Sequence, residues 1–269
     1  TATTELYPLS LHDALLISLF IAIFRAQGRS RCLGSVRRSM SSDLAAVAPG
    51  TVQLIDMIFP GDANHHGTLF GGVALAHMDK VAFLAATRHG RAPFVTAASD
   101  KIDFRAPGRI GEMVEATGRV VRVGNSSLDV EVELVAEALV TGERRTCASG
   151  RFAMVAVKTA ETVLPLPPLD LTASAPNDDL LRMVEIVFPP QTNHYGTLYG
   201  GDALKMMGKA AFIAATRRAR AVMVVAASDK IEFESPIREG ELVELAARPV
   251  GTGRSEERRV GKECRSRWS

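Results

Sequence analysis

The sequence predicts an α+β protein made of two copies of one unit, in each of which a curved antiparallel sheet wraps around a single buried helix. The first observation is a repeat: the segment from Asn64 to Glu112 recurs 129 residues further along without a gap, and 31 of its 49 positions are identical. The second is one long, largely apolar segment of helical length in each copy. The third is that four segments typical of strands follow this helix in the first copy. Two copies are too few for a solenoid array.

The helix of the first copy is predicted to begin at Gly71-Gly72 and to end near Arg88. Apolar residues, among them Met78 and Phe83, occupy nearly every face of this segment. A helix that is apolar on all sides has to be covered by protein. We therefore expect the sheet to surround it.

The strands of the first copy are predicted at 51–59, 95–104, 112–123, 127–140 and 145–157. Pro60-Gly61 ends the first of them. In the stretch LDVEVEL, apolar residues from Leu128 to Leu134 alternate with acidic ones. This period of two is typical of a sheet with one buried face and one face in water.

The second copy repeats only the first four elements: a strand at 182–188, a helix at 200–217, and strands at 224–234 and 241–250. Its register with the first copy fails at Glu256, so the last two strands have no counterpart. We expect a truncated second unit with an unpaired sheet edge and an uncovered face on its helix.

These elements predict a first domain at 50–158, a linker rich in Pro, Ser and Thr at 159–179, and an incomplete second domain at 180–255. The two ends resemble translated sequencing-adaptor sequence. We expect a non-native, disordered leader at 1–39 and a non-native tail at 256–269. The apolar run 14–24 is shorter than the roughly 20 residues that span a bilayer, and its basic residues follow it, unlike those of a signal peptide. A genuine N-terminal anchor is the alternative.

Charge and cysteine content exclude some classes of function. Residues 40–255 hold 22 basic and 25 acidic residues, and this mildly acidic body argues against binding to nucleic acid. Cys147 is the one cysteine between the two ends, so a disulfide framework or a cysteine metal site is excluded and a buried thiol is expected.

The motif N-x-x-G-T-L-x-G-G, followed by a buried helix and S-D-K-I-x-F, resembles the tandem hotdog-fold acyl-CoA thioesterases of the cytosolic acyl-CoA hydrolase type. The match covers 50–157 in full and 180–255 in part. The resemblance implies a cytoplasmic hydrolase of fatty acid metabolism, with acyl-CoA as partner and coenzyme A as part of the substrate. It implies no further cofactor, no metal, no nucleic acid and no membrane, and a homo-oligomer of paired hotdog units. It also implies active sites at the seam between the units, where a helix Asp of one unit meets a loop Asn of the other.

On this basis we expect Asp79 to act as the general base and Asn193 to orient the reactants, with the amides of Gly200 and Gly201 polarising the thioester. The chemistry supports these roles, because N–H groups at a helix start are unpaired and lie at the positive end of the macrodipole, where they can stabilise an oxyanion. A carboxylate in an apolar helix is unfavourable unless it is paired or used. The alternative for Asp79 is an ion pair with Lys80 or Lys101.

The second copy has Gly208 where the first has Asp79. One seam therefore lacks its base, and we expect a single working site. The Asn64 loop and the glycines Gly71 and Gly72 are then substrate-binding positions of the seam without a base, and Asn64 is a relic. Alternatively, both Asn side chains only cap turns, and the glycines serve only close packing.

Further substrate contacts are expected at the turn Gly124, Asn125, Ser126 and Ser127, which matches a family turn that touches coenzyme A. A plain hairpin turn is the alternative. We expect loop structure rather than metal ligation for His65, His66 and His194, and a packed position at the seam for His77. Asp100-Lys101 and Asp229-Lys230 are expected to form local ion pairs.

Two other functions stay open. One is a hotdog hydratase or dehydratase, although such enzymes use a helix His or acidic pair that this sequence lacks. The other is a non-catalytic acyl-CoA-binding or interaction module.

Overall fold

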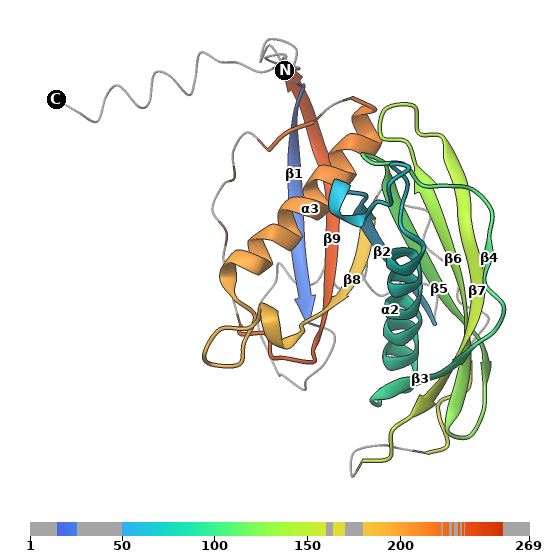
Figure 1. The fold of residues 1–269 in the computed structure, drawn as a ribbon. Coiled ribbons are helices and arrows are strands. Elements are labelled where there is room, and N and C mark those ends of the chain that lie inside the picture. The colour runs from blue at the N-terminus through green and yellow to red at the C-terminus, as the bar shows by residue number, and fades with distance from the viewer. Residues whose placement is uncertain are drawn as a thin grey trace.

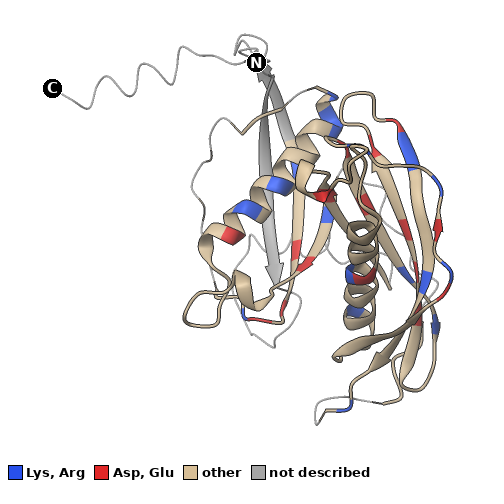
Figure 2. Cartoon of the chain, viewed as in Figure 1, with Lys and Arg blue, Asp and Glu red and all other residues tan. Residues whose placement is uncertain are grey.

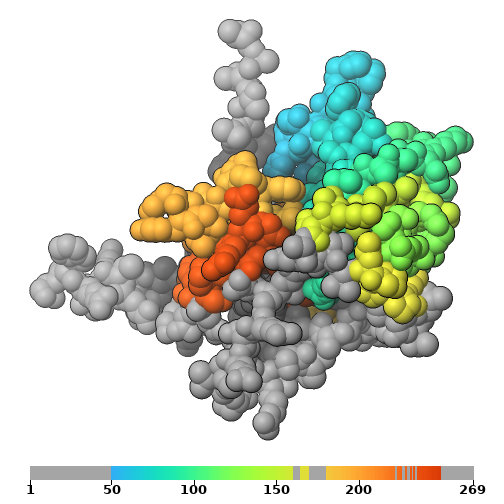
Figure 3. Space-filling view, turned by 90° about the horizontal axis from the view of Figure 1, so that it is seen from below, coloured from blue at the N-terminus to red at the C-terminus, as the bar shows by residue number. Residues whose placement is uncertain are grey.

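A computed structural model describes residues 15–25, 50–159, 164–169 and 180–254, except 222, 226–227, 229–230, 232 and 234. For 15–25 and 250–254 only the backbone is described. Two antiparallel sheets, each with one helix against it, lie side by side (Figures 1 and 3).

The first unit has the element order that the sequence predicts. Its sheet runs β2-β5-β6-β7-β3, with the short β4 paired to β7. The bounds are β2 Thr51–Met57, β3 Phe94–Ser99, β4 Asp103–Phe104, β5 Met113–Val123, β6 Ser127–Glu137 and β7 Arg144–Ala156. The predicted strand 95–104 is therefore two strands, β3 and β4, on the same partner. A 3-10 turn, η2 (Pro60–Asp62), leads from β2 towards the helix.

Helix α2 (Gly71–Gly90) packs against β2, β3, β5, β6 and β7. Figure 1 shows the curved sheet wrapping around it. Met78, Val81 and Leu84 are fully buried. The wrapped helix predicted from its apolar faces is confirmed. Neither helix in the described part of the chain is long and apolar enough to cross a membrane.

The alternation in β6 is confirmed, with one departure. Leu128 to Leu134 bury their apolar side chains, while Glu131 and Glu133 are exposed. Asp129 is buried as well, because Arg122 of β5 donates two hydrogen bonds to it, at 2.7 and 3.0 Å. These bonds hold the pKa of Asp129 below its ordinary value against the effect of burial.

The second unit contains β8 (Leu181–Ile186), the 3-10 turn η3 (Pro189–Gln191), α3 (Gly200–Ala219) and β9 (Leu242–Arg254). The predicted strand 224–234 is wrong, because the described residues of that segment form no strand. The physical reason is the missing partner. The equivalent β3 pairs with β7, and the second sheet has no counterpart of β7.

The leader holds one further strand, β1 (Leu15–Arg25), which pairs antiparallel with β9 on the side away from β8. It takes the place that β6 has beside β5. The prediction of a disordered leader is therefore wrong for 15–25, and so is the prediction of an unpaired edge. An open strand edge offers unmatched N–H and C=O groups, and the apolar run supplies a strand for them. Residues 1–14, 26–49 and the tail 256–269 lie outside the described residues.

The two units exchange core residues reciprocally. Ile55 and Met113 belong to the apolar cluster of the second unit. Val184 and Leu242, which lie 129 residues after them, belong to the cluster of the first. Reciprocal contacts between equivalent residues are the signature of a twofold interface. The units therefore pair about a pseudo-twofold axis, with β2 and β8 next to each other.

Candidate active site

The repeated motif folds into the same tight turn in both units. In the first, Oδ1 of Asn64 accepts hydrogen bonds from the backbone N–H of His66 at 2.9 Å and of Thr68 at 3.3 Å. Its Nδ2 donates to the hydroxyl of Thr68 at 3.0 Å. Gly67 has a φ of +71°, a left-handed conformation that favours glycine. The spacing of Asn, Gly and Thr in the motif is thus the spacing of one turn.

In the second unit, Asn193 makes the same contacts, to Tyr195 N–H at 2.9 Å, Thr197 N–H at 3.3 Å and the Thr197 hydroxyl at 3.0 Å. The turn-forming role is therefore confirmed for both Asn residues. It leaves room for a second role, since Nδ2 carries two hydrogens and Thr197 takes one.

The helix starts are glycine-tipped and lack side-chain caps. The residues before them, Phe70 and Tyr199, make no capping hydrogen bond in the described part of the chain. A Cβ on Gly72 would lie 2.7 Å from the ring of Phe70, and one on Gly201 would lie 2.7 Å from the ring of Tyr199. These glycines therefore make room for an aromatic ring rather than for the sheet. The first N–H groups of each helix are left to other partners.

Asp79 lies half-buried in the middle of α2, where its Oδ1 accepts a hydrogen bond of 2.6 Å from the hydroxyl of Thr96 on β3. The alternative ion pairs are wrong, because Lys80 pairs with Glu185 and Lys101 pairs with Asp103. A hydrogen-bonded carboxylate at this place keeps its second oxygen for another partner.

The sequence analysis missed Thr96. A usable signal was present, because Val225 stands at the position 129 residues further along. The second copy has thus lost both members of the Asp79–Thr96 pair, one to Gly208 and the other to Val225.

The middle of α2 faces the loop that carries Asn193. Nζ of Lys80, the residue after Asp79, lies 2.6 Å from Glu185 and 5.7 Å from the centre of the Phe188 ring. Phe188 begins the η3 turn that leads into Asn193. Among the described contacts no hydrogen bond joins Asp79 to Asn193, so their cooperation stays a prediction.

The other seam is built in the same way. Lys209, which is equivalent to Lys80, lies 3.2 Å from Asp56, which is equivalent to Glu185. It also lies 3.3 Å from Glu185 itself. Burial lowers the pKa of Lys209, but Glu185 and Asp56 outweigh burial and raise it above its ordinary value. Gly208 precedes Lys209, so this seam presents glycine where the first presents Asp79. Figure 2 shows these charges around the middle of both helices.

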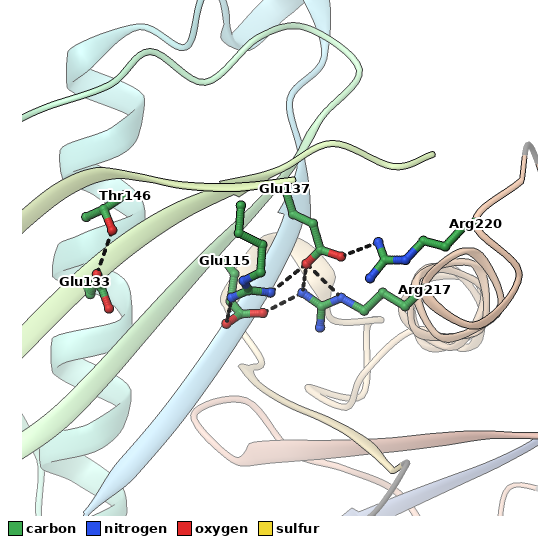
Figure 4. Close-up of polar contacts among 7 residues, drawn as sticks. Glu115, Glu133, Glu137, Thr146, Arg217 and Arg220 are labelled. Atoms are coloured by element: carbon green, nitrogen blue, oxygen red, sulfur yellow. Dashed lines mark hydrogen bonds and ion pairs between the residues drawn. The ribbon is translucent and has the colours of Figure 1, made fainter. Parts of the chain in front are cut away.

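A second ion network ties the end of α3 to the first sheet (Figure 4). Arg217 donates to Glu115 at 2.5 Å and to Glu137 at 2.7 Å, and Arg220 donates to Glu137 at 2.7 Å. Burial by itself raises the pKa of Glu137, but Arg220, Arg217 and Arg144 outweigh it and hold the pKa below its ordinary value. The network fixes α3 relative to the first unit.

The histidines do not form a site. His65, His66 and His194 are exposed in the motif loops, and no group of three potential ligands exists among the described residues. His77 is half-buried, and burial lowers its pKa. Lys209 of the second unit is among the charges that act on it, which confirms its predicted place at the seam.

Three smaller predictions have mixed outcomes. Cys147 is buried, as expected, and burial raises the pKa of its thiol. Asp100 and Lys101 do not pair, since Lys101 bonds to Asp103, and Asp229 and Lys230 lie outside the described residues. The turn 124–127 is a hairpin turn closed by the N–H of Gly124 on the carbonyl of Ser127 at 2.7 Å. Its contact with coenzyme A stays a prediction.

A cavity of about 210 Å³ lies at the start of α2, away from Asp79. The residues that line it are Leu69, Ala74, Phe104, Arg105, Ala106, Pro107, Gly108, Leu134 and Cys147. It therefore belongs to the seam of Gly208.

Comparison with known proteins fits this geometry. The sequence profile of the thioesterase superfamily matches residues 66–143 and 195–256. The chain belongs to the thioesterase superfamily. Its units are the hotdog fold that the sequence predicts. Among solved structures of the superfamily, an acyl-CoA hydrolase from Agrobacterium tumefaciens is 41% identical with a TM-score of 0.66, over 76% of this chain and 97% of that one.

Curated members of the superfamily are larger. Acyl-coenzyme A thioesterase 11 of Mus musculus is 28% identical over 242 residues, which are 74% of this chain and 41% of the mouse protein. The cytosolic acyl coenzyme A thioester hydrolase of Rattus norvegicus is 23% identical over 238 residues, 72% of this chain and 62% of the rat protein. The chain thus spans less than two thirds of either mammalian relative.

Proposed function

We propose that this chain hydrolyses the thioester of fatty acyl-CoA to a free fatty acid and coenzyme A, at one site formed by both units. The observation that carries the proposal is the asymmetry of the Asp79–Thr96 pair. The pair is hydrogen-bonded in the first unit, and the second unit has Gly208 and Val225 in its place. The names of the superfamily members above support the reaction class.

In the proposed mechanism, the carboxylate of Asp79 takes a proton from a water molecule as the water oxygen attacks the thioester carbon. Thr96 holds one carboxylate oxygen and leaves the other for the water. The oxyanion that forms receives hydrogen bonds from the amides of Gly200 and Gly201 and from the free N–H of Asn193. Its collapse breaks the carbon–sulfur bond, and the proton on Asp79 passes to the departing thiolate.

The resemblance adds three predictions to this proposal. The turn 124–127 contacts coenzyme A, the enzyme acts in the cytoplasm, and the chain forms a homo-oligomer. Five consecutive exposed residues on β3, from Val95 to Ser99, support the last of these, since they offer a surface for another copy. Sedimentation of the purified chain measures the oligomer directly.

Three matched variants test the proposal in an assay of free-thiol release from acyl-CoA. Asp79→Asn and Asn193→Ala each lower kcat at least about 100-fold, because they remove the base and an oxyanion donor. Asn64→Ala keeps most of the turnover, because its seam has no base. An equal loss in all three variants contradicts the division of roles. Tight binding of acyl-CoA by calorimetry without thiol release identifies a binding module instead.

A further inference from the structure

We infer that the seam of Gly208 binds a second molecule of acyl-CoA without hydrolysing it. This seam consists of the Asn64 loop, the start of α2 and the middle of α3 around Gly208. The inference rests on the proposed function, because the ligand of one seam is deduced from that of the other.

The parts of this seam that contact substrate are intact. The hydrogen bonds inside the Asn64 turn have the same lengths as those inside the Asn193 turn, 2.9, 3.3 and 3.0 Å. Both helices begin with two glycines beneath an aromatic ring and lack a side-chain cap in the described part of the chain. A carbonyl oxygen therefore meets the same donors at either seam.

The parts that this seam has lost serve only the activation of water. Gly208 removes the base, and Val225 removes the hydroxyl that would hold it. A Cβ placed on Gly208 has no heavy atom within 4 Å. The space left by the carboxylate is thus open, and no neighbouring side chain has closed the seam.

Exposed aromatic side chains surround both helix starts in equivalent pairs. The pairs are Phe59 with Phe188, Phe70 with Tyr199, and Phe104 with Phe233, and each of the six residues is between 44% and 59% exposed. Exposed aromatic clusters mark sites of contact with a ligand or a protein. The Gly208 seam has kept its full set.

The cavity at the start of α2 gives this ligand a place for its acyl group. Most of its lining is apolar, and Phe104 connects it to the helix start, because a Cβ on Gly71 would lie 3.9 Å from the Phe104 ring. Its volume of about 210 Å³ is below the roughly 300–1,000 Å³ of typical ligand pockets, which favours a short acyl chain. Arg105 also lines it and has no ion pair among the described residues. A free guanidinium there complements the phosphates of coenzyme A.

The first test counts bound ligand on the full chain by equilibrium dialysis. The probe is a short-chain 2-oxoalkyl thioether of coenzyme A, which has a carbonyl but no thioester. We expect two molecules per chain, for the wild type and for Asp79→Asn alike. One molecule per chain, with normal thiol release, overturns the second site and leaves the proposed function standing. No binding and no thiol release overturn both. Displacement of the second molecule by free fatty acid but not by coenzyme A overturns the assignment to acyl-CoA.

The second test restores the missing groups. In the Asp79→Asn background, adding Gly208→Asp with Val225→Thr raises thiol release at least about tenfold over the background. The matched control is Gly208→Asn with Val225→Thr, which has the same shape without the base and stays at the background rate. Equal rates in the Asp and Asn versions contradict the inference that this seam lacks only its water-activating groups.

Discussion

At the scale of single residues, the account depends on one hydrogen bond. The hydroxyl of Thr96 donates to Asp79 at 2.6 Å, which fixes the carboxylate and leaves one oxygen free. A misplacement of a catalytic group by about 1 Å can lower a rate about 100-fold. Thr96 is therefore a positioning residue for the proposed base.

Replacing Thr96 tests this role. Thr96→Val lowers kcat about 10- to 100-fold with little change in KM, because the carboxylate loses its orientation while the substrate contacts remain. Thr96→Ser restores kcat. The matched control is Val225→Ala in the second unit, which leaves kcat unchanged. A Ser variant as slow as the Val variant shows that Thr96 acts through packing rather than through its hydroxyl.

Sequence reasoning reaches Asp79 but stops before Thr96 for a physical reason. An acidic residue in an apolar helix is conspicuous, because it is unfavourable without a partner. A Thr in a strand is ordinary, and its contact with a helix residue 17 positions earlier depends on how the sheet curves around the helix. The comparison of the two copies carries the needed signal, because both residues change together.

At the scale of elements, equivalent ion pairs at the seam are unequal in strength. Arg217 bonds to two buried glutamates, Glu115 and Glu137. Its equivalent Arg88 reaches only Glu244, at 3.4 Å, and its Nη1 is buried without a hydrogen-bond partner in the described part of the chain. A buried donor without a partner is destabilising. The end of α3 is therefore held more firmly than the end of α2.

Two matched substitutions measure this difference. Arg217→Met lowers the free energy of unfolding by about 2 kcal/mol, because hydrogen bonds between charged groups are lost. Arg88→Met changes it by less than about 1 kcal/mol, because the variant also removes an unsatisfied donor. Calorimetric Tm values of the two variants provide the comparison. Equal losses of Tm contradict the view that the network in Figure 4 is the stronger of the two.

The network also predicts a dependence on pH. The folded-state pKa of Glu137 lies below its ordinary value, so its contribution to stability is present above the unfolded pKa of about 4.3. It is lost as the pH falls through the folded-state pKa. Glu137→Gln is therefore less stable than the wild type at pH 7, and the difference in Tm shrinks below about pH 4.

A control for this prediction lies on the same strand. Glu133 is exposed and bonds to Thr146 at 2.9 Å. Glu133→Gln stays close to the wild type at every pH, because an exposed pair contributes little. A pH-independent deficit in Glu137→Gln indicates a packing defect instead of a lost charge.

The sequence predicts elements well where the pattern is local and poorly where a strand needs a distant partner. The helices and β6 follow from their own apolar pattern. The strand expected at 224–234 has the composition of β3 but no β7 to pair with. Conversely, β1 forms in a segment expected to be disordered, because β9 offers it an edge. Pairing of distant segments thus decides both failures.

At the scale of the whole molecule, duplication has produced two seams with one frame and different chemistry. The frame is symmetric, since Lys80 and Lys209 bridge the units at equivalent places. The chemistry is asymmetric, since the seams differ at positions 79 and 208 and at 96 and 225. The central claim is that Asp79 of one unit and Asn193 of the other act on the same substrate molecule.

A crystal structure of the full chain with the 2-oxoalkyl thioether of coenzyme A tests this claim most directly. The account predicts one analogue whose carbonyl oxygen accepts a hydrogen bond from Asn193 and whose carbonyl carbon lies within one water molecule of the Asp79 carboxylate. A carbonyl that reaches Asp79 while Asn193 stays on another face of the molecule would contradict it.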